Sequence, residues 1–212
     1  MIQSDDQSAE STRQRLFDAA LSCFARRGYR GTTTRAICDA ADVNLALLSY
    51  HWGGKGPLFE AVVRELHERL LAIAQRGALC GADYPDPVDA IRGFLEVVTA
   101  DLLADPRPLR VMAWAQLAPE GFDPDLAHGS YAPAVQAGAT WLTALQRQGL
   151  IPADVDVELA LITYYGLVAE PVLEPGVHRH LFQADHTDPA HAARLQRHLV
   201  ASGLRLLGLE SS

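Results

Sequence analysis

The first predicted element is a helix over residues 12–27, where apolar side chains recur at helical spacing and polar ones lie between them. Ser11 and Gln14 have the spacing of a capping box at its start. Gly28 ends the helix, because glycine readily adopts the left-handed conformation found just beyond a helix C-terminus. The positions predicted to face inward are Leu16, Ala20, Cys23 and Phe24.

Two shorter helices are predicted at Arg35–Ala41 and Leu45–Trp52. Thr33 and Asn44 precede them and are of the residue types that cap helix N-termini through a side-chain oxygen. Asp42 lies at the tight turn between them, where aspartate tolerates the left-handed conformation better than most residues. A packing helix followed by two short helices and an intervening turn predicts a helix-turn-helix. The predicted inward positions of the short helices are Ile37, Ala41, Leu48 and Trp52, with Cys38 beside them.

The rest of the chain also has helical patterns, and prolines and glycines cluster at the joints between them. The segment Glu170–Asp188 is predicted as an ordered loop or a frayed helix end. No convincing strand pattern is present, so the fold class is predicted to be all-α. The further helices are predicted at Lys55–Gln75, Pro87–Ala104, Pro108–Leu117, Ser130–Gln148, Asp156–Ala169 and Pro189–Leu207.

Charge is distributed unevenly between the predicted helix-turn-helix and the remainder of the chain. The net charge of −8 by itself argues against a nucleic-acid partner, because phosphates repel an acidic surface. Residues 11–55, however, contain seven basic and three acidic side chains, a net charge of +4 that leaves −12 for the remainder. The asymmetry predicts a basic DNA-reading segment on an acidic body.

The cysteines and the N-terminus indicate a cytoplasmic protein. Cys23, Cys38 and Cys80 show neither disulfide-framework nor zinc-ligand spacing, so no metal site is predicted and a reducing compartment fits best. Residues 1–10 lack the features of a signal peptide and are expected to form a disordered arm. No run of 18 apolar residues occurs, so no membrane association is expected.

Residues from about 12 to 63 resemble the DNA-binding segment of the TetR family of transcriptional regulators. The resemblance rests on RRGY at the end of the first helix, TTTR at the entry to the second, and the run Tyr50-His51-Trp52-Gly53-Gly54-Lys55. This run is similar to the family branch that carries Tyr-His-Phe-Gly-Gly-Lys. Two residues depart from the family pattern: Asp42 stands where glycine is usual, and Ser49 stands where many members have a tyrosine that touches the DNA backbone.

The resemblance implies an N-terminal three-helix helix-turn-helix domain at 11–56 and a C-terminal helical domain at 57–212 that senses a ligand and forms a homodimer. It also implies double-stranded operator DNA as a partner, a small-molecule effector of unknown identity, and no cofactor. The function expected is that of a repressor released from its operator by a small apolar or aromatic ligand. Dimerisation is expected through the last two long helices, whose apolar residues include Leu159, Ile162, Leu167, Leu195, Leu199, Leu204, Leu206 and Leu207.

Specific side chains are expected to contact DNA. Thr33 and Lys55 lie at helix N-termini, which attract phosphate, although simple capping is an alternative for Thr33. Tyr50 and His51 are expected to donate to phosphates, with a partly buried packing pair as the alternative. Arg35 is expected to reach a guanine base, with a solvated or phosphate-bound side chain as the alternative. Leu45 and Ala46 are expected to contact thymine methyl groups or to read shape. The predicted set is completed by Thr34, Asn44 and Ser49.

The carboxyl half offers aromatic and histidine residues whose roles are open. Six residues on helical patterns are candidates for a ligand pocket, with core packing as the alternative. The histidines, among them His178 and His180, are predicted to lie in a solvated loop and not to bind a metal, since positions i and i+2 do not share a helix face. The candidate pocket residues are Phe94, Met112, Trp114, Trp141, Tyr164 and Tyr165.

Two rival functions are an enzyme and an interaction protein that uses the helix-turn-helix without DNA. An enzyme is not expected, because no Ser-His-Asp, metal-ligand or phosphate-loop signature occurs. The GGKG run does not qualify as a phosphate loop, since Ser49 and Gly56 occupy positions that need glycine and Ser or Thr.

Overall fold

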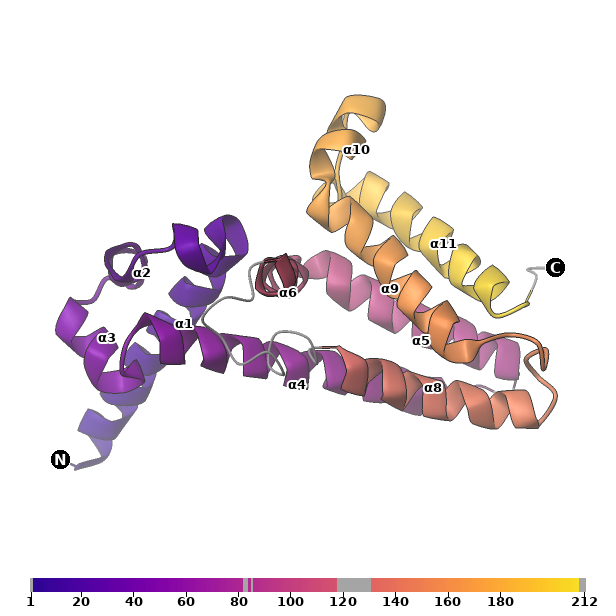
Figure 1. Ribbon diagram of the computed structural model, residues 1–212, viewed down its shortest axis with the longest axis horizontal. Helices are drawn as coiled ribbons and strands as arrows, with labels where there is room; N and C mark the ends of the chain where they lie inside the picture. The colour runs from indigo at the N-terminus through magenta and orange to yellow at the C-terminus, as the bar shows by residue number, and fades with distance from the viewer. Residues whose placement is uncertain (1, 82–83, 85, 118–130, 210–212) are drawn as a thin grey trace. The chain divides into compact units, whose positions relative to one another are not determined.

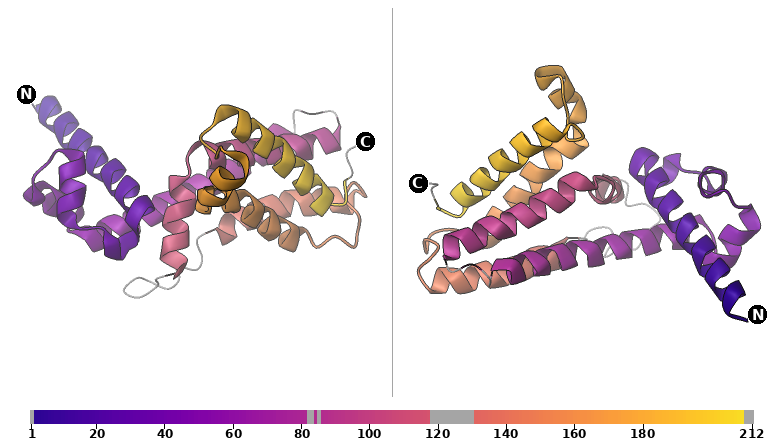
Figure 2. Two further views of the ribbon diagram at one scale, coloured as in Figure 1. Left: turned by 90° about the horizontal axis from the view of Figure 1, so that it is seen from above. Right: turned by 180° about the vertical axis from the view of Figure 1, so that it is seen from behind.

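The computed structural model describes residues 2–81, 84, 86–117 and 131–209. Within these ranges every regular element is a helix, which confirms the predicted all-α fold (Figures 1 and 2). None of these helices is long and apolar enough to cross a membrane. In chain order they are α1 (Ile2–Gly31), α2 (Thr34–Ala41), α3 (Leu45–Trp52), α4 (Lys55–Gly81), α5 (Pro87–Ala104), α6 (Arg107–Leu117), α8 (Ala132–Arg147), α9 (Val157–Leu173), α10 (Pro175–Phe182) and α11 (Pro189–Leu206).

The chain divides into two compact units. The first contains Met1–Leu66 and Arg110–Ser130, and the second contains His67–Leu109 and Tyr131–Ser212. Helices α4 and α6 each supply residues to both units. The first unit extends beyond residue 56, the domain end expected from the sequence, because the start of α4 is buried in its core.

The core of the first unit is built around packed aromatic rings. The ring of Phe24 in α1 meets that of Phe59 in α4 edge to face, with centroids 4.9 Å apart, and Tyr29 lies 5.1 Å from Phe59. Each large apolar side chain buried here contributes about 1.5–3 kcal/mol to stability. The inward positions predicted for the first three helices are confirmed as buried, except that Trp52 is only partly buried.

The ends of α1 differ from the prediction. The helix begins at Ile2, so residues 2–10 are helical where a disordered arm is expected. Ser11 therefore lies inside the helix, and the predicted capping box is wrong; Gln14 donates instead to Asp18 at 3.2 Å. The helical geometry breaks at Gly28 (φ 65°, ψ −179°), as predicted, before a last turn that ends at Gly31.

The second unit packs α5, α8, α9 and α11 together with the later part of α4 (Figure 1). The hydroxyl groups of Thr99 in α5 and Tyr164 in α9 form a buried hydrogen bond of 2.5 Å. The predicted bounds of α5 are confirmed. Its start is set by Asp86, which caps the helix by accepting from the Val88 N–H at 2.8 Å, and by Pro87 in the first turn.

The segment predicted as a loop or frayed helix end is mostly helical. Helix α9 continues through Pro171 to Leu173, and α10 follows at once from Pro175 to Phe182. The helix was not predicted because α10 exposes the apolar residues Val177 and Leu181, so its sequence does not alternate between a buried apolar face and an exposed polar face.

Three of the histidines predicted to lie in a solvated loop are buried: His178, His186 and His191. The Nδ1 atom of His178 lies 3.0 Å from Nε2 of His191, and its Nε2 atom lies 2.9 Å from a carboxylate oxygen of Glu170. Among the described residues no group of three or more potential ligands is arranged to hold a metal ion. His128 and the side chain of Cys80 lie outside the described part of the chain.

Candidate functional site

The local geometry of α2 and α3 is set by side-chain caps and one left-handed turn. Thr33 accepts from the Ala36 N–H at 3.1 Å, and Asn44 accepts from the Leu47 N–H at 3.0 Å, which confirms both predicted caps. Asp42 adopts the left-handed conformation (φ 53°, ψ 54°), also as predicted. Each cap satisfies a backbone donor that the helix itself leaves without a partner. Both helix starts are therefore fixed by local side-chain caps.

Helix α3 buries one face and exposes the opposite one. Leu48 is fully buried in the core of the first unit. Leu45 is 55% exposed and Tyr50 is 81% exposed. Ala46 and Ser49 are exposed beside them. Large apolar and aromatic side chains thus stand in solvent on one short helix, as is expected of a surface that meets a partner.

The other predicted DNA-contact residues flank this face. Thr33, Arg35 and Asn44 are exposed, whereas Thr34 and His51 are half-buried. The hydroxyl hydrogen of Thr33 remains available for donation, because its oxygen serves the cap as an acceptor. His51 packs edge-on against Tyr50, with ring centroids 5.0 Å apart.

Lys55 has internal partners that the sequence does not reveal. Its ammonium group donates to the carbonyl oxygens of Tyr29 (3.1 Å) and Thr32 (2.9 Å) and lies 4.0 Å from the centroid of the Tyr29 ring. An ammonium has three donors, so at most one is left for a phosphate. The main role of Lys55 in the structure is to join the start of α4 to the end of α1.

Three residues of the first unit have structural contacts that were not predicted from the sequence. Thr32 is buried, with its hydroxyl 2.8 Å from the carbonyl oxygen of Gly28 and 3.1 Å from that of Cys23. From α1, Arg15 contacts Asp42 in the turn before α3, and Arg13 contacts Trp52 at the end of α3. The arginines gave no signal because their contacts join residues far apart in sequence.

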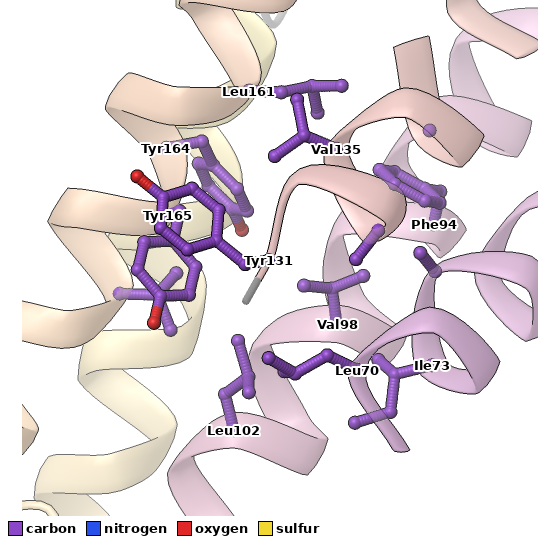
Figure 3. A pocket seen from close by; sticks show the side chains of 14 residues that line it. Leu70, Ile73, Phe94, Val98, Leu102, Tyr131, Val135, Leu161, Tyr164 and Tyr165 are labelled. Atoms are coloured by element: carbon purple, nitrogen blue, oxygen red, sulfur yellow. The ribbon is translucent and has the colours of Figure 1, made fainter. Parts of the chain in front are cut away.

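The second unit contains an apolar cavity of about 70 Å³ (Figure 3). The rings of Tyr131 and Tyr165 stack at one side of it, with centroids 4.5 Å apart and planes only 9° from parallel. Helices α4, α5, α8 and α9 all contribute to its wall. The lining residues are Leu70, Ile73, Ala74, Phe94, Val98, Leu102, Tyr131, Ala134, Val135, Gly138, Leu161, Tyr164, Tyr165 and Val168.

Three of the six predicted pocket residues line this cavity: Phe94, Tyr164 and Tyr165. Trp141 packs behind Phe94, with ring centroids 5.3 Å apart. The other two predicted residues lie elsewhere. Met112 is fully buried in α6, outside the cavity wall. Trp114 lies in the first unit, where its ring is so close to Gly28 that a Cβ there would come within 2.9 Å of it.

The chemistry of the cavity is that of a neutral apolar site. Burial raises the pKa of Tyr164 to about 12 and also raises the pKa of Tyr165, so both phenols are uncharged at neutral pH. The Tyr164 hydroxyl is already hydrogen-bonded to Thr99. The stacked pair of tyrosines offers flat faces to which an aromatic ring can be added. The wall therefore favours a neutral apolar or aromatic molecule.

Comparison with known proteins places the first unit in a family. Residues 16–62 match the family described as bacterial regulatory proteins, tetR family. The chain is 27% identical over 174 residues to ArpR of Pseudomonas putida, a probable HTH-type transcriptional regulator, covering 79% of this chain and 81% of ArpR. It is 31% identical over 86 residues to the HTH-type transcriptional repressor AcnR of Corynebacterium glutamicum, covering 41% of this chain and 42% of AcnR. The chain thus spans less than half the length of AcnR.

The fold of both units together has counterparts among solved structures. The putative transcriptional regulator SCO4942 from Streptomyces coelicolor superposes with a TM-score of 0.70 at 22% identity. The superposition covers 92% of this chain and 97% of SCO4942. The helix-turn-helix geometry, the matched segment and this fold lead to one assignment. Residues 16–62 belong to the TetR family, and the matches together support a TetR-type transcriptional regulator.

Proposed function

We propose that this chain is a homodimeric repressor in the cytoplasm that binds operator DNA through α3 and releases it when a small apolar or aromatic molecule enters the cavity of the second unit. One observation carries the DNA-binding half of the proposal: α3 buries Leu48 and presents Leu45, Ala46, Ser49 and Tyr50 together in solvent. A helix of this kind in a helix-turn-helix enters the major groove with its exposed face.

Each exposed residue has a proposed contact. Leu45 and Ala46 meet thymine methyl groups or read groove shape, and Arg35 at the start of α2 reaches a guanine edge. Thr33, with its free hydroxyl hydrogen, and Tyr50 donate to phosphates. The remaining proposed contacts to the DNA backbone are made by Thr34, Asn44, Ser49, His51 and the third donor of Lys55.

The proposed dimer interface is centred on α9. Leu159, Ile162 and Leu167 are exposed along this helix, between 39% and 60% of each side chain. Three leucines of α11 and its end that were expected to share the interface are buried in their own unit: Leu199, Leu204 and Leu207. Helix α9 therefore supplies most of the apolar surface, and a two-fold dimer built on it matches a palindromic operator.

Ligand release is proposed from the size and composition of the cavity. A volume of about 70 Å³ is far below the roughly 300–1,000 Å³ of typical ligand pockets, so a ligand must widen it. Leu70, Ile73 and Ala74 of α4 form part of the wall, and α4 is one continuous helix from Lys55 to Gly81. Widening the cavity displaces α4, the helix whose first turns share a hydrophobic core with Leu48 of α3. The ligand acts only to the extent that it binds this widened state more tightly.

The experiment for DNA binding is selection of duplexes from a random-sequence pool, followed by titration of wild type and two variants. We expect a palindromic sequence with half-sites about 34 Å apart, one turn of DNA. Ala46→Glu places a negative charge on the exposed face of α3 and should abolish binding. Ala153→Glu makes the same change at an exposed position in the second unit and should bind like wild type. Absence of any selected sequence, or equal binding by both variants, would refute the proposal.

A further inference from the structure

Helix α1 contacts the turn that leads into α3 through Arg15. The Nη2 atom of Arg15 donates to the carbonyl oxygen of Asp42 at 3.0 Å, across 27 positions of sequence. Asp42 is the left-handed residue of the turn, with φ 53° and ψ 54°. Side chains with a Cβ disfavour this conformation, so an external hydrogen bond to its carbonyl group helps to hold it. Arg15 thereby holds the turn that ends α2 and precedes α3.

Helix α1 also contacts the last residue of α3 through Arg13. The guanidinium carbon of Arg13 lies 4.4 Å from the ring centroid of Trp52. The Trp52 indole N–H donates to the Arg13 carbonyl oxygen at 3.3 Å, and the Phe17 ring lies 5.9 Å from the Trp52 ring. The C-terminal end of α3 is thus held on α1 by a cation–π contact, a hydrogen bond and an aromatic contact.

Helix α3 has only eight residues, and Leu48 is its one fully buried side chain. The contacts of Arg15 with the preceding turn and of Arg13 with Trp52 add to this core contact at either side of the helix. We propose that Arg13 and Arg15 are positioning residues that hold α3 in the orientation that reads DNA, and that neither binds phosphate. The inference rests on the proposed DNA-binding function, and it removes two of the seven basic residues between positions 11 and 55 from the DNA interface.

A positioning residue and a phosphate contact have different signatures in DNA binding. Removal of a phosphate contact weakens binding to every sequence and lowers the slope of log K against log salt by about 0.9. Loss of a positioning residue weakens binding only to the specific sequence, because misdirected base contacts do not affect attraction to the backbone. A residue that only stabilises the fold changes the melting temperature and neither binding constant, provided that the protein is fully folded.

The test is titration of Arg15→Gln, Arg13→Gln and Arg15→Lys on the duplex selected by wild type and on an unrelated duplex, over a range of salt concentrations. Arg27→Gln is the matched control, since it removes one charge from an exposed position on the same helix. All titrations are made at a temperature at which circular dichroism shows each variant to be fully folded.

We expect Arg15→Gln to bind the selected duplex about tenfold more weakly, the loss of roughly one charge-assisted hydrogen bond, with unchanged non-specific affinity and salt slope. Arg13→Gln should show a smaller specific loss, because the indole hydrogen bond to the backbone remains. Arg15→Lys should recover most of the affinity, and Arg27→Gln should retain the specific preference of wild type. A lower salt slope or equal losses on both duplexes for Arg15→Gln would overturn the inference, as would unchanged specific binding. Failure of wild type to select any duplex would instead refute the proposed function.

Discussion

The ammonium group of Lys55 donates a 2.9 Å hydrogen bond to the carbonyl oxygen of Thr32, which joins the first residue of α4 to the segment between α1 and α2. A second hydrogen bond and the face of Tyr29 complete its surroundings. These contacts imply that Lys55 stabilises the first unit whether or not DNA is present.

Replacement of Lys55 by Gln should lower the free energy of unfolding by about 1.5–3 kcal/mol, because charge-assisted hydrogen bonds to two helix-end carbonyl groups are lost. Urea denaturation followed by circular dichroism measures the change. Replacement of a surface cation without such partners would change the free energy of unfolding by less than about 0.5 kcal/mol. A result in that smaller range would show that the internal hydrogen bonds of Lys55 have no energetic weight.

Replacement of Gly28 by Ala should destabilise the protein by about 3 kcal/mol. The conformation of Gly28 (φ 65°, ψ −179°) is essentially restricted to glycine, and a Cβ there would lie 2.9 Å from the ring of Trp114. Gly176→Ala is the control, since Gly176 lies in α10 with no atom near its added methyl group, and alanine favours the helix by up to about 1 kcal/mol. Thermal melts of both variants should move in opposite directions; similar melting temperatures would contradict the prediction.

Replacement of Tyr165 by Leu should weaken binding of an aromatic ligand about tenfold and leave operator affinity unchanged. The substitution removes the ring that stacks on Tyr131 at 4.5 Å, an interaction type that contributes about 0.5–1.5 kcal/mol beyond its buried area. Nile red, a neutral aromatic dye whose fluorescence rises in apolar surroundings, is a suitable probe. Trp114→Leu is the control, because Trp114 lies in the first unit. Equal losses in the two variants would place the dye outside the cavity.

Stability should depend on pH through Asp185. Hydrogen bonds from the hydroxyl (2.6 Å) and backbone N–H (2.9 Å) of Thr187, and from Arg179 (2.7 Å), hold the pKa of this carboxyl group well below its ordinary value of 3.8. Because the folded-state pKa is the lower one, the stabilisation is fully present above pH 3.8 and is lost as the pH falls below it.

Asp185→Asn should therefore be less stable than wild type at pH 7, by at least about 1 kcal/mol, and the difference should shrink as the pH is lowered below 3.8. Urea denaturation of both proteins over this range provides the measurement, with the exposed Asp154→Asn as control. A difference that stays constant down to pH 2 would show that the ionised carboxylate is not what stabilises this loop.

Elements with local start and stop signals were predicted well from the sequence. The bounds of α3 and α5 match the prediction, because Asn44 and Asp86 cap these helices through their own side chains. The left-handed turn at Asp42 was predicted from the residue type, because aspartate tolerates this conformation better than most residues.

Features that depend on distant residues were not predictable in the same way. The aromatic pattern identified Tyr164 and Tyr165 but could not separate them from Trp114, since periodicity gives the inward face of a helix and not its neighbour. The contact of Arg15 with Asp42 joins two helices through one long side chain and leaves no periodic trace. The contact between His178 and His191 depends on how α10 folds back on α11, which local propensity does not determine.

In the proposed function, a molecule bound in the cavity and DNA bound at α3 weaken each other's binding through α4. Measurement of this linkage is the most direct test. Nile red affinity is measured on free protein and on protein saturated with the selected duplex, and operator affinity is measured with and without saturating dye. Because coupling is reciprocal, operator DNA should weaken dye binding by the same factor by which the dye weakens operator binding, about 5- to 150-fold. Equal dye affinity for the free and DNA-bound protein would contradict the account.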